Sequence, residues 1–226
     1  MTAKRKSEPA TAPAYTGDHE LVADLMGGLQ LRLAEQLAAR RHRAVTDPAL
    51  KGLVITDAEI DGLLAEGLRS ETESPFAFGS LWTDLEPRMR GDEPLRLVQL
   101  RERFRLTVFE LECVIACLAP EIERRFERIY GYLNDGVALR YPTAELLLRL
   151  FAPATARAQL QSLLASDARL LRSAILVAGA EQQGAPSYRV ADGIVRFLLH
   201  QGGIDALLSR NWCSSRHPPL ARNLWE

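Results

Sequence analysis

Residues 97–142, LVQLRERFRLTVFELECVIACLAPEIERRFERIYGYLNDGVALRYP, contain the clearest helix signals in this chain. Thr107 and Glu110 have the spacing of a capping box, in which each side chain binds the other's backbone amide, so we expect a helix to begin at Thr107. Pro120 suits the first turn of a helix because its ring fixes φ, so we expect a second helix from Pro120 to a stop at Gly131. Apolar residues recur with helical spacing in both, at Leu111, Val114, Ile115 and Leu118 and then at Ile122, Phe126, Ile129 and Tyr130. The stretch therefore predicts two helices that pack against a common core.

Downstream of these helices the pattern changes from helix to short strands. Residues 143–151 and 155–164 have the apolar spacing of helices. Residues 170–177 contain β-branched side chains in mixed alternation, and a Gly- and Pro-bounded loop, 179–186, separates them from 187–190. A closing helix follows, with apolar residues up to Leu199. We therefore predict a mainly α fold with a small two-stranded β-wing.

Several runs of sequence carry a resemblance to a known family. They are GLVITDAEID at 52–61, LRERFRL at 100–106, ECVIACLAPE at 112–121, RIYGYLND at 128–135, YPT at 141–143 and VRFLL at 195–199. Together they resemble the helical, winged-helix region that precedes the ATPase module in a group of bacterial AAA ATPases, including those encoded with contractile injection systems. The resemblance implies a winged-helix-like domain that positions a protein substrate or helps an ATPase ring to assemble. An ATPase module follows in such proteins, whereas this sequence ends at Glu226, so the alternatives are a complete chain, a truncated or split gene product, or an excised part of an ATPase.

Composition and periodicity divide the chain into successive parts. They are a disordered lead at 1–17, an N-terminal helical region at 18–69, a polar, Pro- and Gly-punctuated linker at 70–93, the winged-helix-like domain at 94–203 and an irregular tail at 204–226. Within the N-terminal region, Thr56 and Glu59 form a second capping box, which predicts a short helix there.

Leucine recurs every four residues on the long helix that we expect from Asp18. The positions are Leu21, Leu25, Leu29, Leu33 and Leu37. Such an apolar stripe must be covered, either by this domain itself or by a partner helix, for example in a homo-oligomer. Leu25, Leu29 and Leu33, at the centre of the stripe, are therefore candidate protein-contact residues.

Three aromatic residues stand out in the polar linker: Phe76, Phe78 and Trp82. Either they dock the linker onto the main body, or they form an exposed patch that binds a peptide. They are therefore candidate protein-contact residues as well.

Helices followed by a wing raise the question of DNA binding. A helix that reads the major groove needs Arg, Lys, Asn or Gln side chains that face base edges. Residues 143–151, which we take as the recognition helix, offer only Arg149 beside Glu145 and are otherwise mostly leucine, and the wing loop contains Glu181 and no positive charge. The sequence favours contact with protein over contact with DNA.

The sequence contains no recognisable catalytic or nucleotide-binding motif. A Walker A loop needs a lysine between glycine and Ser or Thr, and the only lysines, Lys4, Lys6 and Lys51, do not have those neighbours. A GxGxxG run is also absent, as are a GxSxG elbow and an HExxH helix. We therefore expect no catalytic residues, no bound cofactor and no ATP hydrolysis by this chain alone.

Charge, cysteine content and hydropathy place the chain among intracellular globular proteins. The 28 basic and 29 acidic side chains give a net charge of -1, so no overall field attracts nucleic acid or a membrane. Cys113 and Cys117 are distant from Cys213 and from the scattered histidines, which argues against disulfides and against a metal site. No apolar run approaches the roughly 20 residues that span a bilayer, and no signal peptide is recognisable. We expect a cytoplasmic protein.

Two functions of different classes remain. The first is a non-catalytic protein-interaction module that contacts AAA ATPase subunits and protein substrate, as the resemblance implies. The second is a winged-helix DNA-binding transcription regulator. The apolar stripe and the absence of groove-reading side chains favour the first.

Overall fold

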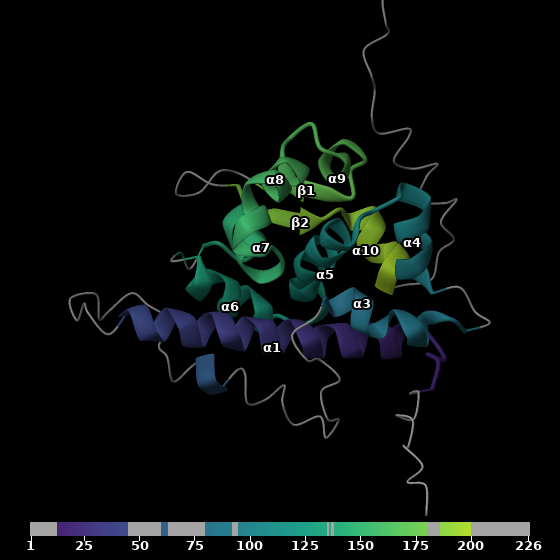
Figure 1. Cartoon of the computed structure of the whole chain (residues 1–226), viewed down its shortest axis with the longest axis horizontal. Coiled ribbons are helices and arrows are strands. Elements are labelled where there is room, and N and C mark those ends of the chain that lie inside the picture. The colour runs from purple at the N-terminus through teal and green to yellow at the C-terminus, as the bar shows by residue number, and fades with distance from the viewer. Residues whose placement is uncertain are drawn as a thin grey trace, which may run out of the picture.

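The computed structural model describes residues 13–44, 60–62, 80–91, 95–134, 136, 138–179 and 186–199, with the side chains of 41–44 excepted. In chain order its elements are α1 (Asp18–Ala44), α3 (Leu81–Leu85), η1 (Glu86–Met89), α4 (Arg96–Phe104), α5 (Val108–Ile122), α6 (Arg125–Leu133), α7 (Ala144–Phe151), η2 (Ala154–Ala156), α8 (Arg157–Gln161), η3 (Ser162–Leu164), α9 (Arg169–Arg172), β1 (Leu176–Ala178), β2 (Tyr188–Val190) and α10 (Asp192–Leu199). Helices dominate, and β1 and β2 form a small sheet on the opposite side of the molecule from α1 (Figure 1). The predicted fold class is confirmed.

The small sheet is an antiparallel pair. Leu176 of β1 lies opposite Val190 of β2, and an isolated bridge joins Thr143, just before α7, to Ser187. The strand predicted over 170–177 is shorter than expected, because its first half forms α9 and a turn in which Ala174 has a φ of 50°. The turn directs the chain from α9 into β1.

Helix α5 is the centre of the fold, and its predicted start at Thr107 is confirmed. The Thr107 amide donates to the Glu110 carboxylate at 2.8 Å, and the Glu110 amide donates to the Thr107 hydroxyl at 3.2 Å. All side chains from Phe109 to Pro120 are buried. Apart from Glu110 and Glu112 these side chains are apolar, so α5 must be covered on nearly every side, and α1, α3, α6, α7 and β2 pack around it.

The prediction that a second helix begins at Pro120 is wrong. Pro120 lies inside α5, which continues to Ile122, and the next helix, α6, begins at Arg125 and passes through Gly131. Proline removes the amide that would bind the carbonyl four residues earlier, at Ala116. The buried Tyr130 hydroxyl donates to that carbonyl at 2.8 Å, so a side chain from α6 replaces the missing bond.

Helix α1 crosses the body beside α3, α5, α6 and α7 (Figure 1). Its leucine stripe is covered by this chain: Leu21, Leu25, Leu29 and Leu33 are 0% exposed and Leu37 is 1% exposed. Of the two alternatives for the stripe, the structure therefore has self-packing. The candidate contact residues Leu25, Leu29 and Leu33 are core residues, because their side chains face the body of the same chain.

Polar side chains of α1 fix its position along the body. Arg32 donates to the Leu150 carbonyl at 2.8 Å, at the end of α7. Arg40 donates to the Leu133 carbonyl at 3.3 Å, at the end of α6. The last carbonyls of a helix have no partner within it and carry partial negative charge, so both guanidiniums suit these positions. Helix α1 is therefore held by burial and by hydrogen bonds.

The predicted division into an N-terminal helical region, a linker and a winged-helix-like domain does not correspond to separate cores. Buried residues from Tyr15 to Leu198 form one cluster, and the linker contributes α3 and η1. At the end of the predicted disordered lead, Tyr15 is buried and its hydroxyl donates to Asp24 at 2.9 Å.

Some sequence predictions fall on residues outside the described part of the chain. They are the capping box of Thr56 and Glu59, the aromatics Phe76 and Phe78, and the tail at 204–226. Among the described helices, none has the length and apolar character needed to cross a membrane.

Candidate functional site

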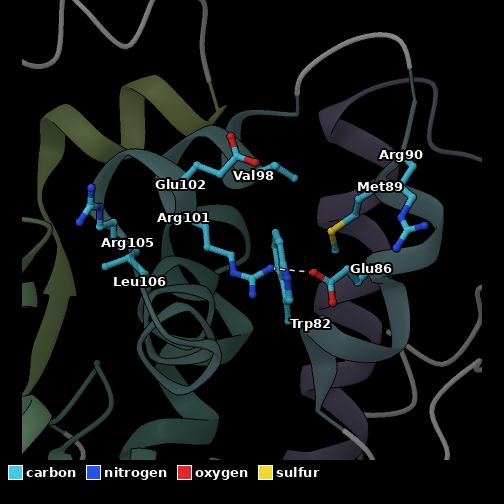
Figure 2. Close-up of a pocket in the computed structure, with 9 residues that line it drawn as sticks. All are labelled: Trp82, Glu86, Met89, Arg90, Val98, Arg101, Glu102, Arg105 and Leu106. Carbon is cyan, nitrogen blue, oxygen red and sulfur yellow. Dashed lines mark hydrogen bonds and ion pairs between the residues drawn. The ribbon is translucent and has the colours of Figure 1, made fainter.

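The candidate site is a cavity between α3–η1 on one side and α4 on the other (Figure 2). Its volume is about 640 Å³, within the range of roughly 300–1,000 Å³ that small-molecule sites occupy. Its lining residues are Trp82, Glu86, Met89, Arg90, Val98, Arg101, Glu102, Arg105 and Leu106. We refer to it as the Trp82 cavity.

A buried carboxylate on α5 positions the α3 side of this cavity. Glu112, 3% exposed, accepts hydrogen bonds from the Ser80 hydroxyl at 2.9 Å and from the Leu81 amide at 2.7 Å. These groups form the start of α3, where free amides and the helix dipole favour a negative charge. Burial nevertheless raises the pKa of Glu112, while the hydrogen bond from Ser80 opposes that rise. Glu112 thus anchors a segment that the sequence suggested was a linker.

Trp82 forms the apolar centre of the cavity. Its side chain is 1% exposed, so this residue docks onto the body, which was one of the two alternatives for the linker aromatics. The Arg101 guanidinium lies 5.5 Å from the centre of the indole ring, within the range of a cation–π contact. Arg101 also forms an ion pair with Glu86 at 2.9 Å (Figure 2). The ring and the carboxylate together fix one arginine inside the cavity.

The η1 side of the cavity is held against α1 by Arg88. Its guanidinium forms an ion pair with Asp24 of α1 at 2.5 Å and lies 4.1 Å from the centre of the Tyr15 ring. The Tyr15 amide donates in return to the Arg88 carbonyl at 2.9 Å. These contacts hold η1, and with it Met89 and Arg90, against α1.

The α4 side ends in a left-handed residue. Arg105 has a φ of 51° and caps α4, where glycine is the commoner choice because it has no Cβ. The Leu106 amide then donates to the Arg101 carbonyl at 2.9 Å, and the Arg169 guanidinium donates to the Arg105 carbonyl. The turn is therefore supported from α9, and it brings Arg105 and Leu106 to the cavity.

Of the three arginines that line the cavity, one forms an ion pair with another described residue and two do not. Arg101 is paired with Glu86, whereas Arg90 and Arg105 are exposed and form no ion pair with the described residues. Glu102 is exposed at the edge, beside Val98 (Figure 2). The described lining residues include the carboxylates Glu86 and Glu102 but no Ser, Thr, Cys, His or Lys, so they offer no nucleophilic hydroxyl, thiol or amine.

Sequence reasoning found one member of this cavity, Trp82, and missed the others. The spacing of Glu86 and Arg90, and of Arg101 and Arg105, would suggest one helical face for each pair, but η1 is a 3-10 helix that ends at Met89 and Arg105 is a left-handed cap. No feature of the sequence near these residues indicated that the α3–η1 segment and α4 lie opposite each other. The stripe residues Leu25, Leu29 and Leu33 do not line the cavity.

The second surface of interest is built around the wing. From α5 onward, the chain runs through helices, the bridge at Thr143, helix α7, the segment α8–α9 and then the antiparallel pair β1–β2. A family model described as "Winged helix domain, variant" matches residues 3–210. The chain belongs to this family. No curated protein and no solved structure matches it significantly.

In this winged-helix domain, α7 is poorly suited to read DNA. Four of its leucines, Leu146, Leu147, Leu148 and Leu150, are buried against the body. Arg149, the only basic residue of this helix, donates to the Leu133 carbonyl at 3.0 Å. The helix predicted for recognition is therefore mainly a core helix.

The segment between α7 and β1 is more exposed, but it is broken. It consists of α8 with five residues, η3 with three and α9 with four. Arg157 donates to the Ala152 carbonyl at 3.4 Å, and Arg169 lies 3.7 Å from Glu110 in addition to its bond to Arg105. Arg172 of α9 is exposed, but short, interrupted helices in which Arg157 and Arg169 contact backbone carbonyls of the same chain differ from a continuous helix that lies in a major groove.

Proposed function

We propose that this winged-helix domain is a non-catalytic protein-interaction module that works with an AAA ATPase, contacting its subunits or its protein substrate. The observation that carries the proposal is the broken α7–α9 segment, which is not the continuous basic helix of a DNA reader. The resemblance of residues 51–201 to the region before the ATPase module supplies the class of partner.

The Trp82 cavity supports the same proposal from another side of the molecule. It combines an aromatic residue, a methionine and arginines, which are the residue types enriched at protein interfaces. A transcription regulator would instead be expected to concentrate basic groups around the wing.

The proposal is tested with the AAA ATPase encoded nearest to this chain in its genome. The two purified proteins are mixed and analysed by size-exclusion chromatography with light scattering, and the steady-state ATPase rate is measured in parallel. We expect a complex of defined mass and a changed rate, because a module that assembles the ring or positions substrate must touch the ATPase. Separate elution together with an unchanged rate would contradict the proposal.

The alternative, a transcription regulator, predicts a different result with duplex DNA. We expect weak binding that decreases steeply with salt, because non-specific association rests on counterion release and the chain carries a net charge of -1. Fluorescence anisotropy at two salt concentrations measures this. Nanomolar, sequence-dependent binding at physiological salt would favour the regulator.

We also propose that the chain alone neither binds nor hydrolyses ATP. The sequence has no lysine with the neighbours of a Walker A loop, so the β- and γ-phosphates lack their usual cationic partner. Calorimetry with Mg-ATP should give no saturable heat. Micromolar binding would contradict this part of the proposal.

A further inference from the structure

We propose that the Trp82 cavity binds an acidic peptide segment of a partner protein, whose apolar side chain enters beside Trp82 and whose carboxylates pair with Arg90 and Arg105. This inference rests on the proposed function, since it specifies the chemistry of the protein partner. It is open to a separate test, because peptide binding can be measured without any ATPase.

The apolar part of the cavity fits a side chain better than it fits an anion. Trp82, Met89, Val98 and Leu106 supply the apolar lining, from both of the opposing elements. The volume of about 640 Å³ leaves room for at least one large side chain. Methionine adapts its shape to different occupants, which suits recognition of a short segment.

The charged part selects for acidic residues. Arg101 is already paired with Glu86, so among the described lining residues the charges without an ion pair are the guanidiniums of Arg90 and Arg105 and the carboxylate of Glu102. Two positive groups against one negative group favour an acidic occupant. Because Arg90 and Arg105 are exposed, they can pair with a carboxylate without losing a partner in the free protein.

The placement of the two free arginines argues for a segment and against a single small anion. Figure 2 shows Arg90 on the η1 side and Arg105 at the far end of α4, with Trp82 and Arg101 between them. An occupant that contacts both guanidiniums must therefore extend past Trp82 and Arg101. A peptide with acidic residues on either side of an apolar residue matches this order of charge, ring and charge.

The site is also held in place before any partner arrives. Glu112 fixes the start of α3, the Asp24 ion pair fixes Arg88 of η1, and the Arg169 bond fixes the turn at Arg105. Binding to a preformed site avoids the entropy cost of ordering its walls. A short peptide can therefore bind measurably without the rest of the partner.

The test uses a fluorescein-labelled peptide in which leucine and phenylalanine alternate with aspartate and glutamate. The control peptide has lysine at every acidic position. We expect saturable binding of the acidic peptide by fluorescence anisotropy, with the lysine peptide at least about tenfold weaker because its charges meet two unpaired arginines. Equal binding of the two peptides, or no binding of the acidic one, would overturn the inference.

Charge reversal locates the contact. The double variant Arg90→Glu, Arg105→Glu should weaken acidic-peptide binding at least about tenfold, because both attractive pairs become repulsive. The matched control is Arg103→Glu, Arg172→Glu, which changes net charge equally at exposed arginines that do not line the cavity. Equal weakening by the two double variants would mean general electrostatics and would overturn the inference. Circular dichroism confirms that each variant is folded.

Two further measurements separate the remaining outcomes. Sulfate that displaces the peptide better than chloride at equal ionic strength would indicate a simple anion site and overturn the peptide assignment. If the chain binds the peptide but forms no complex with the ATPase, only the proposed function fails. If the Arg90→Glu, Arg105→Glu variant still forms the ATPase complex with unchanged affinity, only the inference fails.

Discussion

The leucine stripe of α1 and the Trp82 cavity show how differently a core surface and a contact surface are encoded. The stripe is uniform, regular along one helix and fully covered by the same chain. The cavity joins an indole, a thioether and three arginines from two opposing walls, and although Trp82 is buried, Arg90 and Arg105 are exposed. A strong apolar period indicates burial, whereas an interface in a soluble protein is chemically mixed. The feature that is easiest to find in the sequence is thus the less suitable candidate for partner contact.

The largest expected effect is at the stripe. Leu29→Ala should lower the free energy of unfolding by about 3 kcal/mol, because it leaves a void beside a side chain that is 0% exposed. Leu31→Ala, at a half-buried position of the same helix, should cost clearly less. Urea titration measures both. If Leu29→Ala has the same urea midpoint of unfolding as wild type but a lower mass in solution than wild type, the stripe joins subunits.

The second effect is at Glu112, which links the core helix to the cavity. Glu112→Ala should cost about 1–3 kcal/mol, because it removes the oxygen that accepts both hydrogen bonds and leaves the Ser80 hydroxyl and the Leu81 amide without their acceptor. Acidic-peptide binding should weaken in parallel, since the start of α3 loses its anchor. Urea titration and peptide anisotropy measure the two effects, and Leu31→Ala again serves as the control. A lower free energy of unfolding with unchanged peptide affinity would show that the anchoring of α3 by Glu112 does not contribute to peptide binding.

The same carboxyl group should give a pH dependence of known sign. Burial raises the pKa of Glu112 in the folded chain above its ordinary value of 4.5. Between 4.5 and the raised pKa the folded chain holds more protons than the unfolded chain, so stability falls as the pH rises through this window. Wild type should therefore lose stability relative to Glu112→Gln from pH 4.5 upward. A difference that stays constant with pH would contradict this assignment.

Local signals in the sequence were sufficient where the structure depends on local contacts. The capping box at Thr107, the mainly helical class and the two strands of the wing follow from spacing and residue type, and all three are present. Pro120 shows the limit of such reasoning. Its helix continues because the Tyr130 hydroxyl supplies the missing bond to Ala116, and this contact exists only after α6 has packed.

The Trp82 cavity could not be predicted for the same reason. The start of α3 is fixed by Glu112, which lies 31 positions from Leu81. The opposing wall depends on the left-handed turn at Arg105, a position that glycine more often occupies. The sequence therefore identified Trp82 as noteworthy and left open whether it was docked or exposed, because that depends on these distant contacts.

The smallest expected change in stability is at the ion pair inside the cavity, and it separates the two kinds of surface most clearly. Glu86→Gln removes the partner of Arg101, but the Arg101 side chain is 30% exposed and the Glu86 side chain 45%, so the free energy of unfolding should fall by no more than about 0.5–1 kcal/mol.

The affinity for the acidic peptide should rise although the stability falls slightly. With Glu86 neutral, Arg101 becomes a third unpaired guanidinium beside Trp82, and the acidic peptide should bind about threefold or more tightly. Glu35→Gln, an equal change of charge at an exposed position on α1, should leave that affinity unchanged. Tighter binding with nearly unchanged stability would mark Glu86 as part of a recognition surface, whereas a loss of several kcal/mol with no effect on the peptide would make it a structural residue like the leucines of the stripe.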